Sequence, residues 1–277
     1  MEYAEITLKI EPVMPFSDIL MYEMGEIGCE SFVTTDDGFK AYIPSSDLNT
    51  DALNNILANA GECNIQYDIN IIPDQNWNAV WESTHEPVLV DDFCWVYAPF
   101  HGTNANAKYN ILIEPKMSFG TAHHATTYMM ISLLRDEDIT NKTVLDMGSG
   151  TAVLAILAEM RGAKYVEAID NDEWAYNNAL ENIENNNCKN IKAILGDASV
   201  LTADKKFQLI IANINRNIVL RDMKPYIAVL EQGGTLLLSG FYEHDIPAIR
   251  QEAESNGMKF ETYKERNEWV ACKFTKQ

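Results

Sequence analysis

The chain has 277 residues, of which 47% are hydrophobic and 22% charged, and its formal net charge is −20. This length suits one large domain or two modest ones, and the hydrophobic content is typical of globular proteins, which excludes an intrinsically disordered chain. A chain this acidic is repelled by nucleic acid phosphates and by anionic lipid, so we expect no direct nucleic acid binding and no membrane partner.

The location expected from the sequence is the cytoplasm. No run approaches the roughly 18 apolar residues that a membrane-spanning helix needs. The opening "MEYAEITLKIEP" has neither the basic nor the apolar region of a signal peptide. The five cysteines include no CxxC pair and no spacing typical of zinc, so we expect reduced thiols and no metal site.

The first seventy residues alternate strand-like and helix-like runs in the order βαββαβ, which is the order of a ferredoxin-like domain. The dipeptide Asp37-Gly38 predicts a hairpin, and Ser17 and Gly28 are the expected N-cap and end of the first helix. The expected strands cover 3–12, a hairpin over 31–44, and 64–73, and the expected helices cover 16–28 and 48–60.

This N-terminal module is strongly acidic. Residues 1–70 contain thirteen acidic and two basic residues, a net charge of −11. One interpretation is a solvated face that aids solubility. The other is an electrostatic attraction for a basic protein, and charge alone leaves both open.

A short aromatic segment separates this module from the rest of the chain. "DQNWNAVWES" places Trp77 and Trp81 four residues apart, on one face of a helix. Strand-like runs in "PVLVDDFCWVYAPF" and "YNILIEP" follow it. We therefore expect a ferredoxin-like domain over 1–72, a connector helix over 73–86 and a second domain over 87–277.

From residue 140 onward the pattern becomes a series of βα repeats. Strand-like runs are "KTVLDM", "YVEAID", "IKAILGD", "FQLIIANI" and "GTLLLSGF", with helical stretches between them. This alternation predicts a parallel sheet with crossover helices. The last two runs, "KFETYKERN" and "EWVACKFTK", are expected to close the sheet as an antiparallel hairpin.

"VLDMGSGTAVLAI" carries the main chemical signal. A strand ends at Asp146, Gly148 and Gly150 allow a tight turn and close backbone approach to a ligand, and a helix then begins. The next strand ends in Asp170, where an acid can accept hydrogen bonds from both hydroxyls of a ribose. The pattern favours a nucleotide or nucleoside over a merely structural turn.

Other residues narrow the kind of ligand. Val153 stands where a dinucleotide-binding fingerprint has a third small residue, and no Walker A lysine follows the glycines. Asn213 ends the fourth strand of the repeats, at the carboxyl edge where open α/β sheets bind ligands. Its amide offers both a donor and acceptors, so it can grip a ligand or orient an amine.

The chain resembles a known family at this point. DxGxG resembles motif I of class I methyltransferases, and "LGDA" resembles their next motif, with Asp197 placed to meet the adenine amine. The chain also resembles the PrmA family, methyltransferases of large-subunit ribosomal protein eleven. The segments that carry this resemblance are, in order, "DQNWNAVWES", "FGTAHHATT", "VLDMGSGTAVLAI", "AIDND", "IIANI" and "GGTLLLSGF". The resemblance runs from about residue 74 to the C-terminus, and the N-terminal module matches only in pattern.

The resemblance implies an α/β class I methyltransferase sheet, S-adenosylmethionine as cofactor, and lysine amines of the basic ribosomal protein eleven as methyl acceptors, with its N-terminal amine as a further candidate. A monomer is expected. The implied cofactor-binding residues are Phe119, Gly120, Thr121, Thr127, Asp146, Gly148, Gly150, Asp170, Asp197 and Asn213. At the substrate end the implied residues are His124 and Ile214, and Asn213 is the candidate catalytic residue. The chain departs from the family at Ala122, where a glycine is usual, so a stiffer loop is expected there.

Several alternatives were weighed against this interpretation. A metal site at His123 and His124 is disfavoured because adjacent side chains diverge and no third ligand is near in sequence. Nucleophilic catalysis lacks a motif such as GxSxG. The other possibilities are a class I methyltransferase of another protein or a small amine, a nucleoside-binding regulatory protein without activity, and a dehydrogenase.

Overall fold

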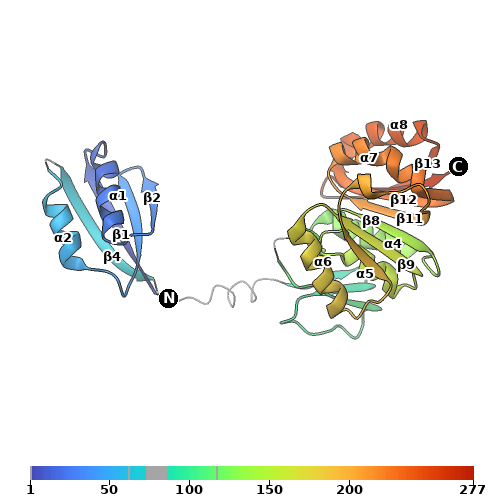
Figure 1. The fold of residues 1–277 in the computed structure, drawn as a ribbon, viewed down its shortest axis with the longest axis horizontal. Coiled ribbons are helices and arrows are strands. Elements are labelled where there is room, and N and C mark those ends of the chain that lie inside the picture. The colour runs from blue at the N-terminus through green and yellow to red at the C-terminus, as the bar shows by residue number, and fades with distance from the viewer. Residues whose placement is uncertain (1, 62, 73–85, 117) are drawn as a thin grey trace. The chain divides into compact units, whose positions relative to one another are not determined.

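The structure, a computed structural model, describes residues 2–61, 63–72, 86–116 and 118–277. The chain divides into two compact units, Met1–Thr84 and His85–Gln277. In Figure 1 the first unit is coloured blue to cyan and the second green to red. The predicted connector helix over 73–86, with its two tryptophans, lies outside the described residues apart from Glu86.

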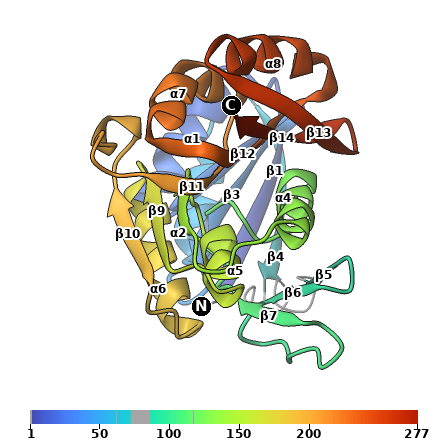
Figure 2. The same ribbon diagram turned by 90° about the vertical axis from the view of Figure 1, so that its right-hand side faces the viewer.

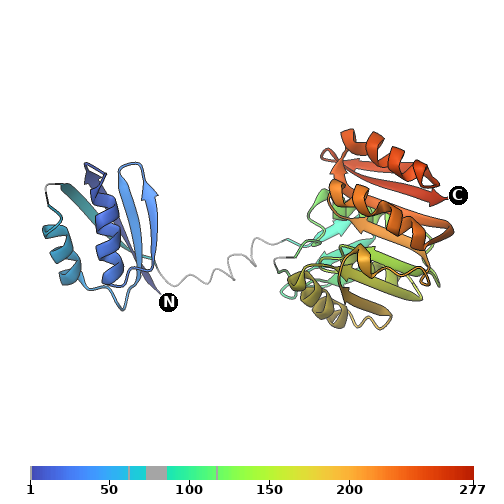
Figure 3. The ribbon, with the colours of Figure 1, turned by 45° about the horizontal axis from the view of Figure 1, so that its top comes forward.

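The N-terminal unit is an antiparallel sheet with two helices on one face (Figure 3). Its elements are β1 (Tyr3–Glu11), α1 (Phe16–Glu26), β2 (Ser31–Thr35), β3 (Gly38–Pro44), α2 (Thr50–Ala58) and β4 (Asn64–Ile72). The strand order is β2-β3-β1-β4, with β1 antiparallel to both of its neighbours. The predicted ferredoxin-like arrangement is confirmed.

The period-two pattern of β1 explains why the sheet has one buried face. Its buried residues are Ala4, Ile6, Leu8 and Ile10. The predicted helix begins at the right residue, but the predicted N-cap is wrong, because Pro15 occupies the N-cap and Ser17 lies inside the helix, buried. No side chain caps α1, and the N–H of Ser17 donates instead to the backbone carbonyl of Val13 at 2.8 Å.

The C-terminal unit is built on a seven-stranded sheet. Its strands are β8 (Thr143–Met147), β9 (Tyr165–Asp170), β10 (Ile191–Leu195), β11 (Phe207–Asn213), β12 (Leu230–Tyr242), β13 (Met258–Arg266) and β14 (Trp269–Lys276). Their order is β10-β9-β8-β11-β12-β14-β13, parallel from β10 to β12 and antiparallel in the closing hairpin. Both the parallel sheet and the hairpin are as predicted.

Helices cover both faces of this sheet. They are α4 (Ala125–Asp136), α5 (Val153–Met160), α6 (Glu173–Asn185), α7 (Arg216–Val229) and α8 (Ile246–Ser255), with short 3₁₀ turns η1 (Ala198–Val200) and η2 (Glu243–Asp245). Alternate residues of β11 supply two separate cores. Leu209 and Ile211 pack with α4 and α5, whereas Ile210 and Ala212 pack with α7 and α8. Figure 2 shows the two pairs of helices on opposite sides of the sheet.

A small sheet precedes α4, and asparagine side chains hold its edge. Its strands are β5 (Val88–Val90), β6 (Cys94–Tyr97) and β7 (Tyr109–Leu112), in that order. Asn186, at the end of α6, accepts the N–H of Leu112 at 2.9 Å and donates to its carbonyl at 2.6 Å. One turn earlier, Asn182 accepts the N–H of Glu114 at 2.8 Å, and Asn178 donates to the Glu114 carbonyl at 3.3 Å. The asparagines are four residues apart on the helix, and the two residues they contact are two apart in the extended chain, so the two spacings match.

In the part of the chain that the structure describes, no helix is both long and apolar enough to cross a membrane.

Candidate active site

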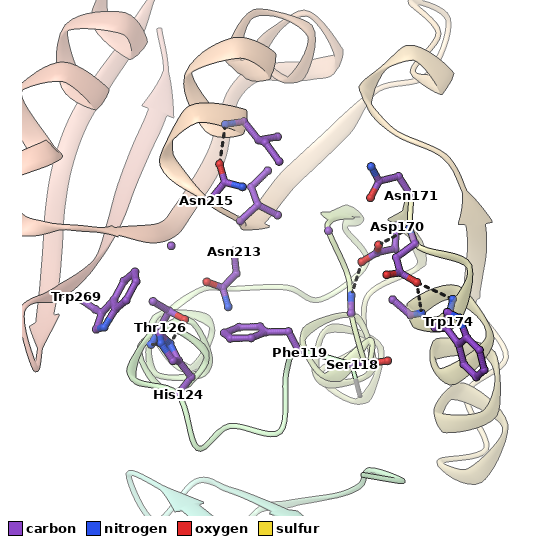
Figure 4. Close-up of a pocket in the computed structure, with 17 residues that line it drawn as sticks. Ser118, Phe119, His124, Thr126, Asp170, Asn171, Trp174, Asn213, Asn215 and Trp269 are labelled. Atoms are coloured by element: carbon purple, nitrogen blue, oxygen red, sulfur yellow. Dashed lines mark hydrogen bonds between the residues drawn. The ribbon is translucent and has the colours of Figure 1, made fainter. Parts of the chain in front are cut away.

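A cavity of about 490 Å³ opens at the carboxyl ends of β8, β9 and β11 (Figure 4). The strand order reverses between β8 and β11, and open α/β sheets bind ligands at such a point. The volume is in the range of small-molecule sites. Of the residues predicted from the sequence, those that line this cavity are Phe119, His124, Gly148, Gly150, Asp170, Asn213 and Ile214.

The loop after β8 depends on two glycines in the left-handed region, Gly148 (φ 68°) and Gly150 (φ 53°). A Cβ on Gly150 would lie 2.2 Å from the carbonyl oxygen of Phe119, and a Cβ on Gly148 would lie 2.1 Å from Cγ2 of Ile214. Neither position accepts a side chain without movement of its neighbour. The bare loop backbone therefore reaches the cavity wall.

Two buried alanines adopt the same left-handed conformation, which costs an L-residue about 1–2 kcal/mol. Ala122 (φ 66°), where the resemblance implies that glycine is usual, has a conformation that glycine adopts more easily. Ala152 (φ 63°) is the N-cap of α5 and was not foreseen from the sequence. The one hint in the sequence is that Ala152 ends a run of small residues that begins at Gly148.

Asp170 connects the end of β9 to the glycine loop. Its Oδ2 accepts the N–H of Gly150 at 2.8 Å, and its Oδ1 accepts the N–H of Asp172 at 3.0 Å. A carboxylate oxygen accepts two hydrogen bonds, so each oxygen keeps one position for a ligand. This leaves capacity for the two ribose hydroxyls that the sequence predicts as partners.

Asp146 lies beneath the glycine loop, and not on the cavity wall as the sequence suggested. Its Oδ2 accepts the N–H of Ala155 in the first turn of α5, at 3.2 Å. Its Oδ1 has no hydrogen-bond partner among the described residues. Burial raises the pKa of Asp146 to about 7, and the negative charge of Asp170 adds to the effect. The residue therefore supports the loop from below.

The segment 118–121 is fastened to the glycine loop through one threonine. The Thr151 N–H donates to the carbonyl of Phe119 at 2.9 Å, and the Thr151 hydroxyl donates to the carbonyl of Gly120 at 2.7 Å. The Phe119 ring remains about half exposed at the cavity, at 51%. Gly120 and Thr121 are not among the residues of the cavity wall, so they act on its shape only through the loop.

The two adjacent histidines diverge. His124 is the N-cap of α4: its Nδ1 accepts the Thr126 N–H at 3.3 Å and lies 2.8 Å from the Thr126 hydroxyl. Burial lowers the pKa of His124, which favours the neutral ring that this cap requires. The Nε2 of His123 lies 2.7 Å from the carbonyl oxygen of Glu86 instead. No cluster of His, Cys, Asp or Glu that could hold a metal occurs among the described residues.

Asn213 points into the cavity from the end of β11 (Figure 4). Its Nδ2 donates to the hydroxyl of Thr127 at 3.3 Å, whereas its Oδ1 is buried and has no partner among the described residues. Thr127, which was predicted to bind the cofactor, is buried behind Asn213. Its neighbour Thr126 lines the cavity instead. An unpaired buried acceptor costs about 1–3 kcal/mol, so a donor on a ligand would relieve that cost.

The residue after Asn213 and a glycine of β12 complete this side of the cavity. Ile214 and Gly240 both line it, and a Cβ on Gly240 would lie 2.0 Å from the carbonyl oxygen of Ile214. Gly240 (φ 98°) was not singled out from the sequence. It allows this carbonyl to pass close to the end of β12.

Asp197 lies in a smaller adjoining cavity of about 60 Å³, which shares Gly148, Asp170 and Ile214 with the large one. Its Oδ1 accepts the N–H of Ser199 at 2.9 Å. Hydrogen bonds from Ser199 hold the pKa of Asp197 below its usual value, so it stays an ionised acceptor.

Two tryptophans of the site were missed at the sequence level. Trp269, at the start of β14, meets the His124 ring edge to face with centroids 4.8 Å apart, and His124 meets Phe119 in the same way at 5.1 Å. Trp174, in the first turn of α6, lies at the cavity and is 82% exposed. Trp174 follows Asp170 closely enough to have been suspected, whereas nothing in the sequence connects Trp269 with His124.

The cavity therefore has two chemically different ends. Asp170 and the glycine loop form a polar end, and Phe119, His124 and Trp269 form an aromatic end. Asn213 lies between them, as Figure 4 shows. Such a site can hold a polar nucleoside beside the alkyl chain of an amine, with an amide oxygen at the junction.

Comparison with known proteins identifies the family. Residues 18–277 match the family model described as "Ribosomal protein L11 methyltransferase (PrmA)". The chain is 46% identical to a ribosomal protein L11 methyltransferase of Bacteroides fragilis over 99% of both chains. It is 34% identical to one of Chlorobaculum tepidum, over 89% of this chain and 88% of the relative. A crystal structure of a ribosomal protein L11 methylase from Lactobacillus delbrueckii subsp. bulgaricus has a similar fold, with a TM-score of 0.64 and 24% identity, over 70% of this chain and 100% of that one.

Proposed function

The chain belongs to the PrmA family of ribosomal protein L11 methyltransferases, and on that premise we propose how its site divides the work. The enzyme uses S-adenosylmethionine to methylate ribosomal protein L11. We propose that the acceptors are lysine side-chain amines, with the N-terminal amine of the protein as a second candidate. The observation that carries this proposal is the unpaired Oδ1 of Asn213 between the polar and aromatic ends of the cavity.

The residues present fit the cofactor. A glycine loop without side chains, a strand-terminal carboxylate with free acceptor positions and an unpaired amide oxygen suit a ribose and an amino acid group. Asp170 would hold the ribose hydroxyls, and Asp197 would hold the adenine amine. The backbone of Gly148 and Gly150 would contact the nucleoside between them. Thr127 would act through its hydrogen bond to Asn213. When bound, S-adenosylmethionine supplies a methyl group on a sulfonium that is already activated for transfer.

The protein's main task is then to orient the amine and to keep it neutral. The Asn213 Oδ1 would accept one N–H of the amine and thereby aim its lone pair. Positioning of this kind can supply about 7–11 kcal/mol of the barrier reduction. Lysine has a reference pKa of about 10.4, so burial of the amine among Phe119, His124 and Trp269 must favour its neutral form. The proton that the lysine ammonium must lose before the transfer leaves to water.

The N-terminal unit is proposed to recruit the basic protein substrate. Its net charge of −11 over residues 1–70 provides long-range attraction, and its compact sheet provides a defined surface. We further propose that the enzyme works as a monomer in the cytoplasm and makes no direct contact with nucleic acid.

The test is an intact-mass measurement of ribosomal protein L11 after incubation with the enzyme and S-adenosylmethionine. We expect increments of whole methyl groups, and peptide mapping should place them on lysines. Asn213→Ala should lower kcat by about a hundredfold, because the lost contact orients the amine, and it should weaken cofactor binding less than the loss of the Asp170 carboxylate does. If the wild-type enzyme binds the cofactor but leaves this protein unmodified, the acceptor is another protein or a small amine.

A further inference from the structure

The aromatic end of the cavity continues outward as a row of rings. Trp269 packs against Tyr242 with ring centroids 4.2 Å apart, and Tyr242 stacks on His244 at 5.6 Å with the planes 18° apart. Trp269 already contacts His124 at the cavity wall. The row therefore runs from Phe119 to His244 without interruption, and only its inner members line the cavity.

Strand pairing fixes the outer part of this row. Tyr242 is the last residue of β12 and is paired with Trp269, the first residue of β14. The turn before Trp269 consists of Asn267 and Glu268, both with positive φ, which is the geometry of a tight hairpin. Tyr242 is 39% exposed and the His244 side chain is 78% exposed, so the row of rings ends at the surface, where His244 is its most exposed member.

Acidic residues surround this outer end. Glu243 follows Tyr242 directly, and its N–H donates to the carbonyl of Glu268 at 3.1 Å, so the two glutamates lie side by side. Glu265 lies in the same hairpin, where its Oε1 accepts the N–H of Glu268 at 2.9 Å. All three glutamates are exposed.

Two of the cations of this region are paired with carboxylates outside the rim, and the third, Arg266, stacks on an aromatic ring. Arg216 forms an ion pair with Asp245 at 2.7 Å, and Lys264 forms one with Asp136 at 3.4 Å. The Arg266 guanidinium lies over the ring of Tyr128, 3.8 Å from its centroid. The glutamates of the outer rim therefore keep a negative field that no described ion pair cancels.

We propose that Tyr242 and His244, with Glu243, Glu265 and Glu268, form an outer subsite for a basic side chain of the protein substrate next to the acceptor lysine. The proposal rests on the proposed function and extends its site outward. Aromatic faces attract ammonium and guanidinium groups, and carboxylates around them strengthen that attraction. A flanking lysine or arginine held here would align the acceptor lysine with the row of rings that leads to Asn213.

The inner and outer ends then have opposite tasks. The inner end must receive a neutral amine, so it offers burial and an amide oxygen without a carboxylate partner. The outer end binds a charged group, so it offers exposed rings and acids. This subsite selects substrates by the residue beside the acceptor, and it contributes to substrate affinity more than to the transfer step.

The test compares Tyr242→Leu with Tyr242→Phe in steady-state methylation of full-length ribosomal protein L11 at pH 8. Leucine keeps apolar volume but removes the ring face, whereas phenylalanine keeps the face. We expect the leucine variant to raise KM for the protein by about threefold to tenfold with little change in kcat, and the phenylalanine variant to stay close to wild type. Glu243→Gln combined with Glu268→Gln should raise KM in the same direction and reduce its salt dependence.

Calorimetric affinity for S-adenosylhomocysteine and the thermal midpoint should be unchanged in these variants, which separates a binding role from a structural one. An unchanged KM in Tyr242→Leu would overturn the subsite. If the wild-type enzyme does not methylate this protein, the proposed function fails and the subsite is tested by NMR instead. In that experiment n-butylammonium, but not n-butanol, should shift the Trp269 and His244 ring signals, and equal shifts from both probes would overturn the proposal.

Discussion

At the scale of single residues, Asp170 combines two tasks that sequence motifs usually treat as one. Its carboxylate fixes the N–H of Gly150 at 2.8 Å and also offers acceptor positions to the cavity. Removing the carboxylate therefore removes ligand contacts and loosens the loop that contributes other contacts.

Asp170→Ala should weaken cofactor binding by about a hundredfold, since hydrogen bonds to a charged acceptor are worth about 1.5–3 kcal/mol each. Asp170→Asn keeps one acceptor oxygen and should lose less. Isothermal titration calorimetry with S-adenosylmethionine measures both, and circular dichroism checks that the fold is intact. Equal affinity in wild type and Asp170→Ala would remove this residue from the site.

Asp146 gives a pH prediction. Its pKa in the folded protein is about 7, above the value of about 3.8 expected when unfolded, so the folded state holds the extra proton between those values. Its contribution to stability is thus full at low pH and is lost as the pH rises through that window. The Asp146→Asn variant has no ionisable group at this position, so it does not lose stability in this way as the pH rises.

Relative to wild type, the unfolding midpoint of Asp146→Asn should rise by roughly 5 °C between pH 5 and pH 8. Differential scanning calorimetry at the two pH values measures the change, and the net charge of the rest of the protein cancels in the comparison. Asp146→Ala is the control, because it loses the bond to Ala155 and should be destabilised at both values. A pH-independent difference between wild type and Asp146→Asn would contradict the assignment.

The location of a site residue was predictable when the residue lies at the end of a strand. Asp170 and Asn213 each end a strand of a parallel sheet, so their edge of the sheet followed from the pattern alone. Thr127 and Asp146 were placed on the wall but lie behind it, because one residue of helical rotation or one step along a strand decides which side chain faces the cavity. Trp269 and Gly240 become part of the site only through tertiary packing.

At the scale of elements, the site depends on how closely two loops approach each other. The carbonyl of Phe119 and the backbone of Gly150 are in contact, so the loop before α4 and the loop before α5 move together. Thr151 strengthens this contact through the carbonyls of both Phe119 and Gly120.

Two glycine substitutions should differ in severity. In Gly150→Ala the new methyl would meet a backbone oxygen at 2.2 Å, which cannot turn aside, whereas in Gly148→Ala it would meet the end of the Ile214 side chain at 2.1 Å, which can. Both also pay about 1–2 kcal/mol for a left-handed alanine. We expect the Gly150 variant to lose at least tenfold more cofactor affinity than the Gly148 variant in calorimetry, and the reverse ranking would contradict the loop geometry.

The elements themselves were largely predictable, because period two and period 3.6 were clear over most of the chain and glycines marked the turns. The closing hairpin of β13 and β14 was expected and found. The N-cap of α1 was assigned to Ser17 instead of Pro15, because the backbone carbonyl of Val13 takes the place of a capping side chain and has no signature in the sequence. The asparagine contacts between α6 and β7 have no local signature.

At the scale of the whole molecule, charge is distributed unevenly between the two units. The first seventy residues carry −11 of the total −20 on a quarter of the chain. The cavity and its glycine loop belong to the other unit, which has its own two cores. The proposed recruitment and the chemistry should therefore be separable.

Removing residues 1–72 should leave S-adenosylmethionine affinity within about twofold of wild type and lower kcat/KM for ribosomal protein L11 by at least about tenfold. Calorimetry and methyl transfer measure the two quantities. In the full-length enzyme, raising the ionic strength from 0.05 to about 0.5 M should increase KM for the protein more than KM for the cofactor. Normal methylation by the shortened enzyme would show that recruitment lies elsewhere.

The asparagines of α6 have one more consequence. The outward N–H and C=O groups of Leu112 and Glu114 would make the edge of the small sheet a template for a foreign strand, and edge strands of this kind promote aggregation. Here three side-chain amides occupy those groups, in the way that a neighbouring strand would. The edge is closed without any added strand, so these amide protons should resist exchange with deuterium, and the sheet should stay unavailable to intermolecular pairing.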